Sequence, residues 1–141
     1  MIEVKLINKS FEGNPILNDV SAKFEQGKTN LIIGQSGSGK TVLLKCLLGL
    51  HEPDNGEVLF DGISTKEMTE SEKTFLRRDM GMVFQGSALF DSMTVLENVM
   101  FPLVMLTEKN RDEIIDIAQN VIKRVELENA FSKLPSELSG G

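Results

Sequence analysis

The chain has 141 residues, a length typical of one domain, and 40% of them are hydrophobic, which is enough to build a core. Its net charge of −6 argues against generic binding to nucleic acid or to anionic lipid surfaces, although a few main-chain amides and one lysine could still bind an anion locally. No apolar stretch is long enough to span a bilayer, and Glu3 and Lys5 interrupt the start before a signal peptide could form.

The N-terminal half of the chain alternates strand and helix patterns. Alternating apolar and polar side chains predict half-buried strands, whereas short continuous apolar runs predict strands buried on both faces. In chain order we expect a strand at 2–7, a turn at 12–15, a strand at 20–24, a buried strand at 31–33, a helix at 40–50, a strand at 57–60, a helix at 69–78 and a buried strand at 80–84. The single cysteine, Cys46, falls in the apolar run of the 40–50 helix, which predicts a buried thiol and a reducing, cytoplasmic setting.

After residue 85 the pattern becomes helical. Three pairs with capping-box spacing predict helix starts: Thr69 with Glu72, Thr94 with Glu97, and Asn110 with Glu113. Pro102 is expected to limit or kink the second of these helices. The third helix places six apolar residues on one face: Ile114, Ile117, Ala118, Val121, Ile122 and Val125. We therefore predict an α/β segment at 1–85 followed by a helical segment at 86–141.

A glycine-rich loop follows the predicted strand at 31–33 and matches the pattern G-x-x-x-x-G-K-[ST] in full. With the residue after it, the loop comprises Gly34, Gln35, Ser36, Gly37, Ser38, Gly39, Lys40, Thr41 and Val42. Its glycines let successive N–H groups turn toward phosphate oxygens, and the following helix adds its positive end. We expect Lys40 to reach the β- and γ-phosphates and the Thr41 hydroxyl to bind Mg²⁺. GTPases, nucleotide kinases and many ATPases share this P-loop, so the reaction stays open at this point.

Three further motifs stand in the order of one family: Lys9-Ser10-Phe11, Met82-Val83-Phe84-Gln85 and Leu138-Ser139-Gly140-Gly141. With the P-loop between them, the chain from Met1 to Gly141 resembles the nucleotide-binding domain of ABC transporters. The resemblance implies a P-loop NTPase core with N-terminal antiparallel strands, followed by a helical subdomain. It also implies that the cofactors are ATP and Mg²⁺.

The resemblance assigns a role to each motif, and each has a plainer alternative. Phe11 would stack on adenine, where a tyrosine is more usual, but a phenylalanine can also be a core side chain. Gln85 would contact Mg²⁺ and the attacking water, but a glutamine after a strand can simply be a surface residue. Ser139, Gly140 and Gly141 would bind the γ-phosphate of an ATP held by a second copy, but Ser-Gly-Gly is also a common linker.

The family's Walker B strand, catalytic glutamate and switch histidine lie beyond the signature motif, and therefore beyond Gly141. Among the residues present, Lys40 and Gln85 are the catalytic candidates, and the general base is missing, so we expect very slow turnover or none. A parallel sheet without its flanking strands exposes an apolar edge, so we also expect self-association, strand exchange, or a sheet arranged unlike that of the full domain. We interpret His51, which follows the 40–50 helix, as structural.

The segment from Phe84 to Val99 is similar to the ATPase subunits of Mla-type phospholipid-trafficking systems. This resemblance implies lipid transport. The wider resemblance to ABC transporters implies a membrane-spanning partner subunit, a head-to-tail dimer of two ATPase copies, and a cytoplasmic position at the inner membrane. Two other functions stay open: a nucleotide-binding fragment that does not hydrolyse ATP, and another P-loop NTPase such as a nucleotide kinase or a GTPase. No Asn-Lys-x-Asp sequence that would read guanine is present.

Overall fold

The computed structural model describes residues 1–84, 86 and 88–138. The chain divides into two compact units, Met1–Met82 and Val83–Gly141, and each unit has its own hydrophobic core. The boundary predicted between an α/β segment at 1–85 and a helical segment at 86–141 stays a prediction. No helix within the described residues is both long and apolar enough to cross a bilayer.

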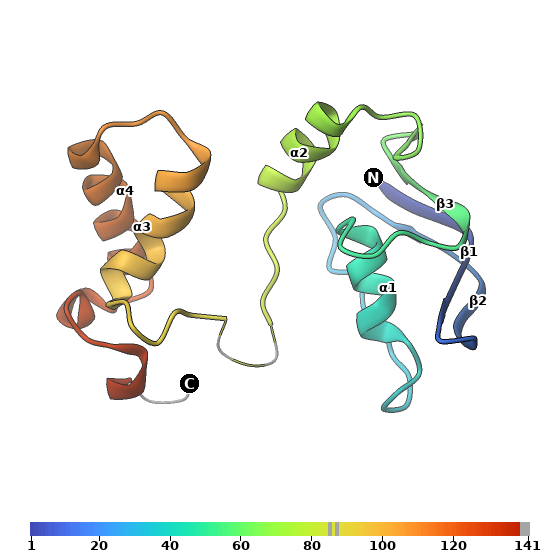
Figure 1. Cartoon of the computed structure of the whole chain (residues 1–141), viewed down its shortest axis with the longest axis horizontal. Coiled ribbons are helices and arrows are strands. Elements are labelled where there is room, and N and C mark those ends of the chain that lie inside the picture. The colour runs from blue at the N-terminus through green and yellow to red at the C-terminus, as the bar shows by residue number, and fades with distance from the viewer. Residues whose placement is uncertain (85, 87, 139–141) are drawn as a thin grey trace. The chain divides into compact units, whose positions relative to one another are not determined.

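The first unit is built on a four-stranded antiparallel sheet in the order β2-β1-β3-β4 (Figure 1). Its strands are β1 (Ile2–Phe11), β2 (Asn14–Phe24), β3 (Asn55–Phe60) and β4 (Ile63–Ser64). Two-residue turns, Glu12-Gly13 and Asp61-Gly62, join β1 to β2 and β3 to β4, and all four residues have positive φ. Such turns match the right-handed twist of the strands that they connect. The strands predicted at 2–7, 20–24 and 57–60 are therefore confirmed.

Helix α1 (Lys40–Leu47) covers one face of this sheet. The core contains four residues from the strands and three from the helix: Val4, Ile7, Leu17, Val58, Leu43, Cys46 and Leu47. Cys46 is buried as predicted, and its burial raises the pKa of the thiol. The helix was predicted to run to residue 50 but ends at Leu47, because Gly49 adopts a left-handed conformation that stops it.

The two predicted buried strands, at 31–33 and 80–84, are wrong, since neither segment forms a strand in this structure. Leu31 is 81% exposed, Ile33 is 82% exposed and Val83 is 98% exposed, while Ile32 packs against the first core. An apolar run becomes a buried strand only when neighbouring strands pair with it on both sides. Within the described residues neither segment has such a partner.

Helix α2 (Glu70–Arg78) completes the first unit. Thr69 caps it as predicted: its side chain accepts a hydrogen bond from the amide of Glu72, and the Glu72 carboxylate accepts one from the amide of Thr69. The helix has no buried residue, and an ion pair between Lys73 and Glu70 at 2.8 Å lies on its surface. Local capping therefore defines this helix more than packing does.

The second unit pairs helix α3 (Val95–Leu106) with helix α4 (Arg111–Arg124), followed by short 3₁₀ turns at Glu128–Ala130 and Pro135–Glu137 (Figure 1). Both predicted capping boxes are present. Pro102 was expected to limit or kink α3; it does not end the helix, which continues to Leu106. On α4 the predicted apolar face is only partly correct: Ile114, Ala118 and Ile122 are buried, whereas Val121 is 43% and Val125 is 61% exposed.

Candidate functional site

The P-loop runs from Gly34 into the first turn of helix α1, and glycine is required at two of its positions. Gly37 has φ +79° and Gly39 has φ +89°, conformations that other residues rarely adopt. A Cβ on Gly39 would lie 2.9 Å from Leu17 Cδ2 and 3.0 Å from the Ile16 carbonyl oxygen, so this end of the loop sits directly on β2. A Cβ on Gly37 would meet nothing within 4 Å, so the loop is open on that side.

The N-terminus of α1 differs from those of the other α-helices. Helices α2, α3 and α4 each begin with a capping box, whereas no side chain caps α1. The amides of Lys40, Thr41 and Val42 have no acceptor within the part of the chain that the structure describes. Uncapped amides and the helix dipole make this end of α1 suited to an anion.

The ammonium group of Lys40 lies across the loop. Its Nζ donates to the Gly34 carbonyl oxygen at 2.8 Å and to the Gln35 carbonyl oxygen at 2.7 Å. The Ser38 amide also donates to the Gln35 carbonyl oxygen, at 3.2 Å. The loop therefore holds a cation beside the uncapped amides of α1, and this arrangement fits a polyphosphate group.

Thr41 and Val42 follow in the first turn of α1. Thr41 is exposed, and Val42 is partly buried against the first core, so the phosphate-binding role predicted for Val42 would use its amide. The described residues contain no group of three His, Cys, Asp or Glu side chains that could hold a metal. A hydroxyl on Thr41 suits Mg²⁺, which commonly takes one or two protein oxygens together with substrate phosphates and water.

Phe11 ends strand β1 and is 40% exposed, so it is not a core side chain. Its ring makes an edge contact with the ring of His51, with centroids 5.3 Å apart and planes at 67°. Lys9 Nζ lies over the Phe11 ring, 5.5 Å from its centroid. The accessible ring is compatible with stacking on a base, and adenine stacking by Phe11 stays a prediction.

One residue of this region, Asp54, was missed by the sequence analysis. Its carboxylate accepts hydrogen bonds from Lys9 Nζ and from both the amide and the hydroxyl of Ser10, each at 2.7 Å. The sequence marks Asp54 only as part of a turn after Pro53. Its partners stand 44 and 45 positions earlier in the chain, so no local pattern indicates the contact.

The contacts of Asp54 predict that the folded state loses stability at acid pH. Its pKa is lowered from 3.8 to about 2, first by the hydrogen bond from Lys9 and then by those from Ser10. Between these two values the unfolded chain binds more protons than the folded chain, so stability rises with pH. This contribution is complete above about pH 4 and is lost as the pH falls toward 2. We expect urea unfolding of Asp54→Asn to depend less steeply on pH in this window than that of the parent, and equal slopes would contradict the expectation.

Gln85, Ser139, Gly140 and Gly141 lie outside the described residues. Of their described neighbours, Gly86 is exposed, and Leu138 packs against the core of the second unit. The roles predicted for the glutamine and for the signature motif therefore stay predictions.

Comparison with known proteins agrees with this geometry. The family model described as "ABC transporter" matches residues 17–141. The chain is 42% identical over 144 residues to the L-cystine import ATP-binding protein TcyC of Bacillus subtilis, covering 100% of this chain and 58% of that protein. It is 40% identical over 140 residues to a probable ribonucleotide transport ATP-binding protein, mkl, of Mycobacterium leprae, covering 99% of this chain and 40% of that one.

A solved structure shares the fold. The dimeric ATP-binding cassette MJ0796, in a post-hydrolysis state bound to ADP and Pi, superposes with a TM-score of 0.84 at 33% identity, covering 99% of this chain and 64% of that one. The chain thus spans less than two thirds of each of these proteins. With the P-loop, the uncapped helix, the family match and the shared fold all in agreement, the chain belongs to the ABC transporter family of ATP-binding domains.

Proposed function

We propose that residues 1–141 form the ATP-binding part of an ABC transporter ATPase that couples ATP binding and hydrolysis to transport. The observation that carries this proposal is the P-loop, in which the Lys40 ammonium and the free amides of α1 lie together. Support comes from the relatives, which are named as ATP-binding proteins of transport systems, and from the MJ0796 cassette, whose structure holds ADP and Pi.

Each predicted site residue has a part in binding. The amides of residues 34–42 would surround the phosphates, and Lys40 would exchange its two carbonyl partners for phosphate oxygens, which bind an ammonium more strongly. Thr41 would hold Mg²⁺, which neutralises charge on the β- and γ-phosphates when bound. Phe11 would stack on the base, and Gln85 would orient the water.

We propose that the chain turns over slowly by itself. Lys40 carries a positive charge, and the amide of Gln85 is not basic, so neither can accept a proton from the attacking water. In this respect the chain behaves as a nucleotide-binding fragment. Faster hydrolysis would need a general base supplied from outside residues 1–141.

The proposed partners are a second ATPase copy and a membrane-spanning subunit, with the ATPase itself at the cytoplasmic face of the inner membrane. Ser139, Gly140 and Gly141 would serve the ATP of the second copy, and the dimeric state of the MJ0796 cassette supports this pairing. The relatives do not point to one transported substrate, because they are named for cystine import and for ribonucleotide transport. The lipid substrate rests only on the resemblance of the segment from Phe84 to Val99.

Self-association of the chain is a further part of the proposal. Leu31 and Ile33, more than four fifths exposed, flank the half-buried Ile32. Light scattering on the unmodified protein and on a Leu31→Thr/Ile33→Thr variant tests whether residues 31–33 mediate the self-association. A monomeric parent would contradict the proposal.

The function is tested by equilibrium binding of ATP with Mg²⁺ and by phosphate release, measured with and without a supplied membrane-spanning partner subunit. We expect binding in both cases and faster release with the subunit. Transfer of phosphate from ATP to a nucleoside monophosphate would favour the nucleotide-kinase alternative. No binding of ATP at millimolar concentration would overturn the proposal.

A further inference from the structure

At the end of strand β1 the side chains of Lys9, Ser10 and Phe11 lie together with that of Asp54, which comes from a distant part of the first unit. Asp54 precedes β3, and its two carboxylate oxygens have different partners. Oδ1 accepts from Lys9 Nζ at 2.7 Å, while Oδ2 accepts from both the amide and the hydroxyl of Ser10, each at 2.7 Å. The Asp54 amide donates to the Asn8 carbonyl oxygen at 2.8 Å, so the turn is fastened to β1 by main chain and side chain alike.

These contacts converge on Phe11, the residue after Ser10. Ser10 is held at its amide, which limits how the next residue can turn. Lys9 is only 17% exposed, and its ammonium lies over the Phe11 ring while bonded to Asp54. Without the carboxylate, a lysine head group would move toward water and leave the ring. Asp54 thus acts on both the main chain before Phe11 and the cation beside its ring.

We infer that Asp54 is a positioning residue for the base of the bound nucleotide, acting on Phe11 through Lys9 and Ser10. This inference rests on the proposed function, in which Phe11 stacks on the base. A ring that is already held in place loses less freedom when a base stacks on it, so the affinity rises without a new contact to the ligand. Asp54 itself touches no ligand in this account.

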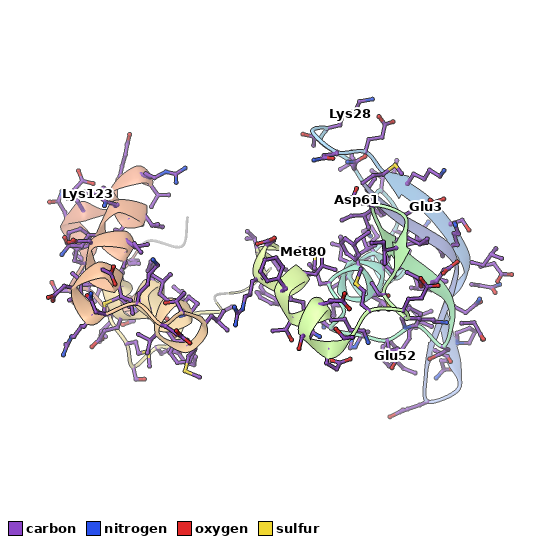
Figure 2. The ribbon with its side chains drawn as sticks, turned by 90° about the horizontal axis from the view of Figure 1, so that it is seen from above. Glu3, Lys28, Glu52, Asp61, Met80 and Lys123 are labelled. Carbon is purple, nitrogen blue, oxygen red and sulfur yellow. The ribbon has the colours of Figure 1, made fainter. Side chains whose placement is uncertain are left out.

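The two carboxylate oxygens allow the two effects to be separated. In Asp54→Asn the carbonyl oxygen can still accept from Ser10, but the NH₂ group that replaces the other oxygen cannot accept a bond from Lys9. In Lys9→Met the cation is removed, while Asp54 keeps its bonds from Ser10. Glu3→Gln is a matched control, because Glu3 pairs with Lys23 at 3.3 Å between β1 and β2 and is only 18% exposed. In Figure 2 Glu3 lies apart from Glu52, which is two residues before Asp54.

The readout is the affinity for ATP divided by the affinity for inorganic triphosphate, each measured with Mg²⁺ by calorimetry. Loss of the whole stacking ring in Phe11→Ala should lower this ratio by about tenfold or more. We expect Asp54→Asn and Lys9→Met to lower it by roughly threefold, a part of that range. Glu3→Gln should leave it unchanged. A merely structural role for Asp54 would change both affinities together and leave the ratio as it is.

The possible failures are distinguishable. If Asp54→Asn melts below the temperature of the assay, Lys9→Met still tests the inference with the Ser10 bonds in place. An unchanged ratio in both variants, with a lowered ratio in Phe11→Ala, overturns the role of Asp54 and leaves the proposed function standing. An unchanged ratio in Phe11→Ala overturns base stacking itself. In an Asp54→Asn/Phe11→Ala double variant the ratio should equal that of Phe11→Ala alone, and a further fall would overturn action through Phe11.

Discussion

Replacing Lys40 with alanine is expected to weaken ATP binding by a factor on the order of 100, because a charged hydrogen bond to phosphate is lost inside the loop. Lys40 is the residue whose ammonium bridges the Gly34 and Gln35 carbonyl oxygens, beside the free amides of α1. No other side chain of the loop carries a positive charge. The measurement is equilibrium binding of ATP with Mg²⁺ to the parent and to Lys40→Ala.

Lys45→Ala is the matched control for this variant. It removes the same charge from the same helix, but at the last turn of α1 and therefore at the opposite end from the loop. We expect it to bind ATP nearly as the parent does. Thermal melting of both variants should show whether the two carbonyl contacts of Lys40 also stabilise the fold. A Lys40→Ala protein that held ATP as firmly as the parent would contradict the account of the site.

The parts of the structure that the sequence predicts correctly are those with local causes. Each capping box needs only the side chains and amides of two residues three positions apart, and all three formed at the predicted residues. The P-loop is similar, since its glycines, its lysine and the helix that follows are neighbours in sequence. The anion site could therefore be predicted from the sequence, because it is built from consecutive main-chain amides.

The parts that could not be predicted depend on residues far apart in the chain. The apolar run at 31–33 specifies a strand only in the presence of partners, and none pairs with it within the described residues. Asp54 reaches Lys9 across 45 positions, and the sequence holds no signal for that pairing. The end of α1 at Leu47 is different, because its cause, the left-handed Gly49, lies only two residues away and was overlooked in the sequence.

Strands β1 and β3 approach each other closely at Gly56, which is another feature that depends on residues far apart in the chain. A substitution at Gly56 is expected to change the stability more than the other substitutions proposed. Gly56 has φ +81°, and a Cβ built on it would lie 2.3 Å from the Leu6 carbonyl oxygen and 2.4 Å from that of Lys5. The pairing of β1 with β3 is irregular here, and Leu6 itself has φ 46°. Backbone oxygens held in a sheet cannot move aside as a flexible side chain can.

Gly56→Ala is therefore expected to destabilise the first unit by more than about 3 kcal/mol, through steric strain as well as an unfavourable φ. Gly62→Ala separates these two causes, since Gly62 has a similar φ of +86° but a methyl group added to it would meet nothing within 4 Å. The cost of Gly62→Ala should be limited to the unfavourable backbone conformation, about 1–2 kcal/mol. Urea unfolding, with hydrogen exchange at the β1 and β3 amides, measures both variants. Equal losses would show that the approach of Gly56 to Leu6 contributes nothing, because the φ penalty is common to the two glycines and only the contact with β1 differs.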